Sequence, residues 1–122
     1  MRPRNEQQLA GLCHLFNAVP GWGMLFCGYV RYAMREESRL VVHHARQAMV
    51  FHSLILAGLM LWVLIELLCR VLAILSIYFS ALLSSLNDLM VAGLIAVYVT
   101  TCLYGAWRCM SGRTFQYPLV RR

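Results

Sequence analysis

The sequence predicts an all-α, polytopic integral membrane protein with three or four membrane helices. Three observations predict this fold. Hydrophobic residues make up 61% of the 122 residues and charged residues only 13%, which is too few to cover the large surface that a small soluble domain exposes to water. The hydrophobic residues gather in stretches of about 20, the length that crosses a bilayer core. Arginines flank these stretches and are sparse within them.

The net charge is +6, and all eleven basic residues are arginines. A basic protein can bind nucleic acid, but these arginines lie at the ends of apolar stretches and form no dense basic stripe. We therefore expect them to anchor helices at an anionic lipid surface, and we expect no nucleic-acid partner.

The first apolar segment covers residues 8–34 and is interrupted near its middle. Pro20 lacks a backbone donor and clashes with the preceding turn, and Asn17, Gly21 and Gly23 lie around it. The segment is therefore either a span kinked at Pro20 or a re-entrant hairpin of two half-helices. Carbonyls freed by the break need partners within protein or water, and the Asn17 amide could supply one.

A polar connector at 35–47 leads to the second apolar segment, at 48–69. Ser38 is a candidate cap for an amphipathic start of the next helix. The 48–69 segment has the length of a full span, and only His52 and Glu66 interrupt it.

Polar residues inside a membrane segment are functional candidates, so His52 and Asn17 are the two best in this chain. Glu66 and Arg70 are four residues apart with the acid first, the order that favours an ion pair on a helix. We expect this pair to lie near a membrane face and to act as an anchor.

Residues 71–84 are apolar but short for a span, so they continue the second helix, lie in the interface or form a short tilted helix. The SSLND sequence at 84–88 predicts a turn, and the last span then covers 89–110. Small residues recur every four positions along this span and permit close contact with another helix; they are Ala92, Ala96 and Thr100.

The arginines also predict the topology. Four lie in 31–46 and four in 108–122, whereas 84–88 holds none. The positive-inside rule therefore places the 35–47 connector and the C-terminus in the cytoplasm, with the protein in a bacterial inner membrane. Arg2 and Arg4 favour a cytoplasmic N-terminus, which a re-entrant first segment allows and a simple three-span arrangement does not.

The five cysteines show no CxxC pair and no Cys/His spacing of a zinc site, so we expect them to act as small hydrophobic residues and predict no metal site. Two histidines from facing helices could hold a haem, and a single histidine could hold a chlorophyll; His14, His44 and His52 are the candidates. Serines are plentiful, but no Ser/His/Asp set lies in a recognisable order, and phosphate-binding glycine loops are absent. We therefore expect a protein that is not an enzyme.

Three motifs occur in order along the chain: LAGLCHLFNAVPGWGMLF, which contains His14 and Pro20; HHARQAMVFH, which contains His44 and Arg46; and a C-terminal YPL, formed by Tyr117, Pro118 and Leu119. Their order and spacing resemble the small bacterial membrane family that is related to the chloroplast Tic-twenty translocon subunit and that includes magnetosome membrane proteins. The stretch around 70–84 is longer than the family pattern. The resemblance implies a three- or four-helix membrane protein without known catalytic chemistry.

The first hypothesis for function is a non-catalytic accessory or scaffold subunit, because so small a chain with small-residue helix faces should pack against a larger integral membrane complex or against copies of itself. A homo-oligomeric channel or protein-translocation component is the second. A haem- or pigment-binding membrane subunit is the third.

Overall fold

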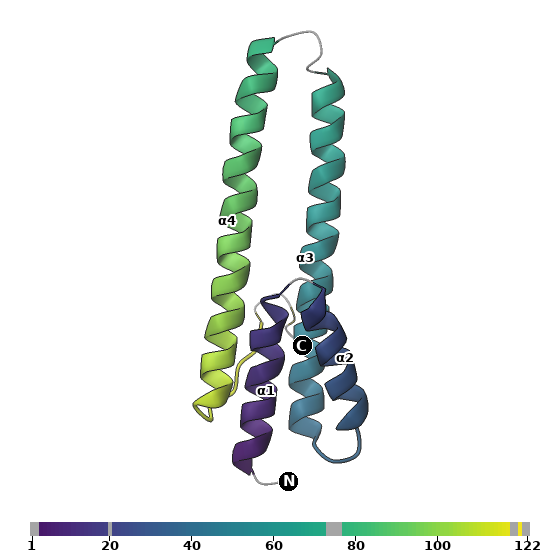
Figure 1. The fold of residues 1–122 in the computed structure, drawn as a ribbon, viewed down its shortest axis with the longest axis vertical. Helices are drawn as coiled ribbons and strands as arrows, with labels where there is room; N and C mark the ends of the chain where they lie inside the picture. Colours follow the sequence, from purple (N-terminus) through teal and green to yellow (C-terminus); the bar gives the residue numbers. More distant parts are fainter. Residues whose placement is uncertain (1–2, 20, 73–76, 118–119, 121–122) are drawn as a thin grey trace.

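The computed structural model describes residues 3–19, 21–72, 77–117 and 120, and this part of the chain is helical and contains no strand. Its four helices are α1 (Pro3–Asn17), α2 (Trp22–Ala33), α3 (Arg39–Leu72) and α4 (Ile77–Met110). Two short helices stand beside one end of a long helical pair (Figure 1). The predicted all-α class is confirmed.

The first apolar segment folds as a hairpin of two short helices. α1 ends at Asn17 and α2 begins at Trp22, and the chain turns back between them, so that α1 starts and α2 ends at the same end of the molecule (Figure 1). Gly21, which caps α2, has a φ of 81°, a conformation that glycine adopts without strain. The backbone therefore matches the re-entrant alternative and not the kinked span, whereas Pro20 itself lies outside the described residues.

Neither helix of this hairpin is long enough to cross a bilayer. α1 has 15 residues and α2 has 12, which correspond to about 22 and 18 Å against a hydrocarbon core of about 30 Å. The two helices pack directly on each other, and α1 also packs on both α3 and α4.

The long helix α3 begins inside the predicted polar connector. Its first turn is capped by Ser38, whose hydroxyl oxygen accepts the backbone N–H of Val41 at 3.3 Å, as the sequence predicted. The expected ion pair also forms on this helix, since the Arg70 Nε donates to Glu66 Oε1 at 2.7 Å.

The turn predicted at 84–88 is wrong, because α4 runs through this sequence without a break. The polar groups that favour turns are satisfied inside the helical pair instead. The Ser85 hydroxyl donates to the carbonyl of Ala81 one turn earlier at 3.2 Å, and the Asn87 Oδ1 accepts the indole N–H of Trp62 in α3 at 2.6 Å. The connection between α3 and α4 therefore lies earlier in the chain, between residues 72 and 77.

Two of the four helices are long and apolar enough to cross a membrane, over Arg39–Val71 and Ala81–Met110; a third or fourth span was expected from the sequence. A core helix of a soluble protein would be mostly buried. In these two helices only 17% and 22% of the most apolar stretch is buried within the chain. Apolar surface of this extent requires lipid or another protein to cover it.

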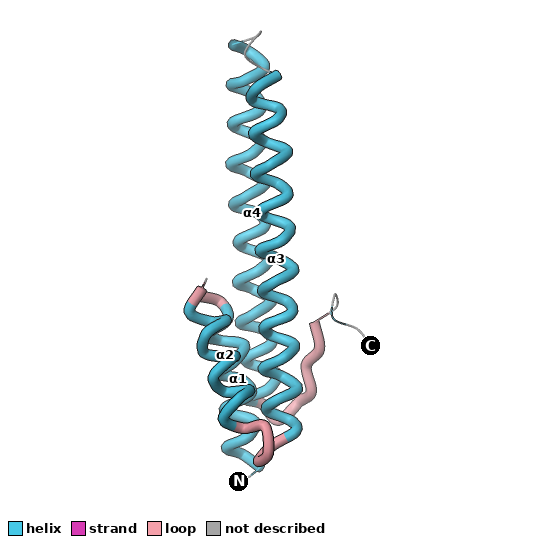
Figure 2. Tube along the Cα trace, turned by 90° about the vertical axis from the view of Figure 1, so that its right-hand side faces the viewer, coloured by secondary structure: helices cyan, strands magenta, loops and turns pink. Residues whose placement is uncertain are grey.

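Internal packing is concentrated at one end of the α3–α4 pair. The α1–α2 hairpin lies against that end on one side and the C-terminal segment lies on the other, while the far half of α3 and α4 extends alone (Figures 1 and 2). The packed end also carries Arg35, which follows α2, and Arg108, which lies in the last turn of α4. The guanidinium carbon of Arg35 lies 5.4 Å from the ring centroid of Tyr32, and that of Arg108 lies 5.9 Å from the ring centroid of Tyr104. Such contacts are typical of a membrane interface.

Candidate functional site

A buried polar cluster joins the packed elements, and His14 of α1 is at its centre. The His14 side chain is fully buried. Its Nδ1 lies 2.8 Å from the hydroxyl of Tyr117, in the C-terminal segment. Its Nε2 lies 3.2 Å from Nδ1 of His44, near the start of α3. One imidazole thus connects the first helix, the third helix and the C-terminal segment.

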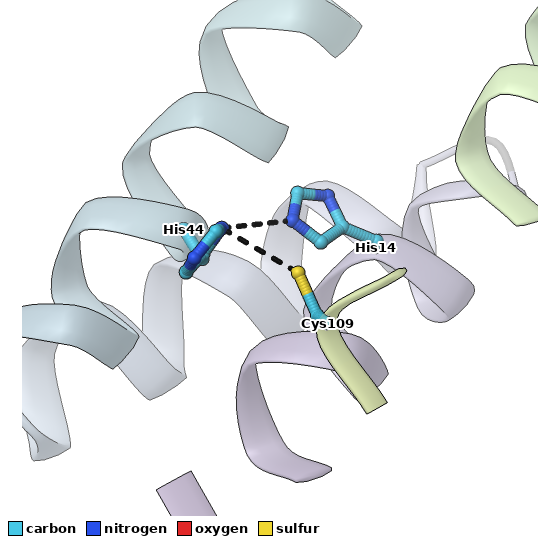
Figure 3. Close-up of side chains that lie close together, drawn as sticks. All are labelled: His14, His44 and Cys109. Atoms are coloured by element: carbon cyan, nitrogen blue, oxygen red, sulfur yellow. Dashed lines mark hydrogen bonds between the residues drawn. The ribbon is translucent and has the colours of Figure 1, made fainter. Parts of the chain in front are cut away.

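The thiol of Cys109 completes this group from the last turn of α4. Its Sγ lies 3.7 Å from Nδ1 of His44, and the side chains of His14, His44 and Cys109 point toward one another from three helices (Figure 3). The three candidate ligand atoms lie within 4.8 Å of one another, and all three residues are buried.

A second polar group lies deeper, where α1 ends. The Asn17 Nδ2 donates to the backbone carbonyl of Ala48 at 3.1 Å, so this amide joins α1 to α3. The Tyr98 hydroxyl donates to the backbone carbonyl of Asn17. Since that proton is used, the His52 Nδ1, 2.6 Å away, donates to the Tyr98 oxygen. The Oδ1 of Asn17 and the Nε2 of His52 are buried and have no hydrogen-bond partner within the part of the chain that the structure describes.

Tyr117 closes the cluster from the C-terminal side. Its ring is fully buried and is stacked on Phe51 of α3 with a centroid separation of 4.0 Å and an interplanar angle of 10°. Its hydroxyl lies 4.0 Å from the Sγ of Cys102 in α4. A contact of this kind combines area burial with aromatic geometry, so the C-terminal segment is part of the folded core.

His14 is neutral in this environment. Burial, and to a smaller extent the neighbouring His44, lowers the pKa of the His14 imidazole to about 3. A neutral imidazole offers one nitrogen lone pair, and the hydrogen bond to Tyr117 decides which nitrogen keeps the proton.

The other candidates from the sequence lie apart from this cluster. Arg46 is exposed on α3, and Gly21 caps α2. Glu66 and Arg70 pair with each other at the far end of α3. Pro20 and Pro118 lie outside the described residues.

His14 and His44 do not form a haem site with two axial histidines, which was one of the alternatives from the sequence. His14 and His44 are in direct contact, with ring centroids 5.3 Å apart and an interplanar angle of 82°, so no macrocycle fits between them. His52 does not share their site, because its partner is Tyr98.

Sequence reasoning missed Cys109 in the buried cluster, Tyr98 in the second polar group and Phe51, on which Tyr117 stacks. A tyrosine inside an apolar span is a polar group in the membrane, a signal that could have identified Tyr98. Cys109 gave no such signal, because it lies 65 residues from His44 and 95 from His14 in the sequence.

Among the comparisons with known proteins, the sequence profile of the MamF/MmsF family, the magnetosome magnetite crystal formation protein family, matches residues 5–122. The chain belongs to the MamF/MmsF family. Membership in this family, together with two long apolar helices that are mostly not buried within the chain, indicates a membrane protein. The sequence resembled a family that includes magnetosome membrane proteins, and this prediction is confirmed. The relationship of that family to the Tic-twenty translocon subunit stays a prediction. No match is found among curated proteins or among solved structures.

Proposed function

We propose that this MamF/MmsF protein is a non-catalytic accessory or scaffold subunit of a membrane assembly. The observation that carries the proposal is the division of the molecule into two halves. One half is a packed core in which buried polar groups join α1, α3, α4 and the C-terminal segment. The other half is a helical pair in which most of the apolar residues are not buried within the chain.

The polar groups of the core support a structural role. His14, Tyr98 and Asn17 each bond to a different element of the fold. Side chains held in this way, away from solvent, join helices and are not positioned to meet a substrate. We therefore propose that the chain is not an enzyme.

The outward surface of α4 supports association with another membrane helix. Ala92, Ala96 and Thr100 are all exposed, so the small-residue stripe is not used to pack α4 within the chain. Helices in lipid associate where small residues let backbones approach closely. We propose that a partner helix, from a larger complex or from a second copy, packs along this stripe.

The arginines at the packed end support contact with anionic lipid headgroups on the cytoplasmic side. In this arrangement α3 and α4 cross the inner membrane, or a membrane derived from it, and the α1–α2 hairpin enters and leaves on the cytoplasmic face.

A channel receives less support from the same surface. A groove between α3 and α4 has a volume of about 180 Å³. It is lined by apolar side chains, and Trp62 is one of the lining residues. An ion or polypeptide path needs polar lining groups. Current recordings from the pure protein in planar bilayers would show no conductance under the accessory-subunit proposal.

The purified protein in mild detergent tests association. We expect wild type to elute with a mass above that of the monomer, as determined by light scattering. Ala96→Leu, which adds bulk on the stripe, should return the protein to a monomer. Val97→Leu is the matched control, because Val97 is 68% exposed on the adjacent face, and this variant should keep the larger mass. A wild type that is a stable monomer in every mild detergent would contradict the proposal.

A further inference from the structure

We propose that His14, His44 and Cys109 form a binding site for a thiophilic transition-metal ion, foremost Zn²⁺. The sequence predicted no metal site, and the site arises only because three helices meet. The proposal does not depend on the function proposed above.

The distances from His44 Nδ1 to the other two donor atoms match tetrahedral coordination, and all three donor atoms lie within 4.8 Å of one another. With zinc–nitrogen bonds of about 2.0–2.1 Å and a zinc–sulfur bond of about 2.3 Å, two nitrogens should lie about 3.3 Å apart, and a nitrogen and a sulfur about 3.6 Å apart. Here His14 Nε2 and His44 Nδ1 are 3.2 Å apart, and Cys109 Sγ and His44 Nδ1 are 3.7 Å apart.

A hydrogen bond to Tyr117 orients the His14 imidazole for metal binding. The His14 Nδ1–H can donate to the Tyr117 hydroxyl at 2.8 Å, which leaves the Nε2 lone pair free on the side of His44 Nδ1. A hydrogen bond from the second ring nitrogen orients metal-binding histidines in this way. The Tyr117 hydroxyl proton can then go to Cys102 Sγ.

A place for a fourth ligand lies beside the trio. A cavity of about 30 Å³ is lined by His44 and Cys109 and also by Gln7 and Arg113. This volume holds about one water molecule. Water or a small anion, which the Arg113 guanidinium would attract, can therefore complete a four-coordinate site.

The donor set selects the ion. One thiolate and two neutral imidazoles prefer Zn²⁺ or Cu⁺, whereas Fe²⁺ binds such a set more weakly. Binding displaces the thiol proton of Cys109, while the proton on His44 Nδ1 moves to the other nitrogen of the same ring. About one proton should therefore be released per metal ion.

The experiment uses the full chain, purified in detergent through an affinity tag without histidines, and titrated with Co²⁺ and then Zn²⁺. We expect one Co²⁺ per chain, with the visible bands of tetrahedral cobalt and a near-ultraviolet sulfur-to-cobalt charge-transfer band, and displacement of cobalt by Zn²⁺. Cys109→Ser should abolish the charge-transfer band. Cys69→Ser, which removes a thiol near the far end of α3 and away from the trio, should leave the spectrum unchanged.

Further variants keep the test decisive if Cys109→Ser is poorly folded. His44→Ala should also lose the cobalt spectrum, and Tyr117→Phe should weaken Zn²⁺ binding by about tenfold or more through the loss of the bond to His14. The absence of stoichiometric cobalt in folded wild type would overturn the proposal, as would a charge-transfer band that persists in Cys109→Ser or disappears in Cys69→Ser.

Discussion

Gly23→Ala is expected to destabilise the α1–α2 hairpin strongly. A Cβ atom at this position would lie 2.4 Å from Asn17 Cα and 2.4 Å from the Phe16 carbonyl oxygen. Both atoms belong to the backbone of α1, so no side-chain rotation relieves the clash. We expect a loss of about 3 kcal/mol or more in the free energy of unfolding, measured by titrating detergent-solubilised protein with sodium dodecyl sulfate.

Gly58→Ala is the matched control, since nothing lies within 4 Å of a Cβ built on Gly58 in α3. This change should leave stability unchanged or raise it by about 1 kcal/mol, because alanine favours helix more than glycine does. If Gly23→Ala were as stable as Gly58→Ala, the close contact between α1 and α2 would not exist in the protein.

Tyr117→Ala is the second change with a large expected effect. The ring is fully buried and stacked on Phe51, so its removal leaves a cavity where the C-terminal segment meets α1, α3 and α4. Truncation of a buried aromatic residue costs about 3–5 kcal/mol. We expect this loss in the same denaturant titration, together with faster proteolysis at the C-terminus.

Tyr117→Phe separates the ring from its hydroxyl. The ring still stacks, but His14 Nδ1 loses its partner at 2.8 Å in a buried site, which should cost about 1–3 kcal/mol. A Tyr117→Phe protein with wild-type stability would show that this hydrogen bond does not stabilise the fold.

The sequence was informative about features that depend on local chemistry. Ser38 precedes the periodic part of α3 and caps it, and Glu66 and Arg70 pair across one helical turn. The cluster of Asn17, Gly21 and Gly23 identified the break between α1 and α2. Each of these features is decided within a few residues, so its pattern is visible in one stretch of sequence.

The SSLND sequence misled for a physical reason. Serine and asparagine favour turns because their side chains compete for backbone groups, but Ser85 bonds one helical turn back and Asn87 accepts from Trp62 of the neighbouring helix. These hydrogen bonds within the helical pair therefore outweigh the local preference of serine and asparagine for a turn. Long-range geometry likewise explains why the His14–His44–Cys109 trio was not foreseen, since only the packing of α1 against α3 and α4 brings these side chains together.

The sidedness of the two termini tests the membrane account most directly. A fluorescent reporter that matures only in the cytoplasm would be fused to the N-terminus in one strain and to the C-terminus in another, and a phosphatase that is active only outside would be inserted between residues 72 and 77 in a third. We expect fluorescence from both terminal fusions and phosphatase activity from the insertion. An N-terminal fusion without fluorescence, beside a fluorescent C-terminal fusion, would mean that residues 8–34 cross the bilayer and would contradict the re-entrant hairpin.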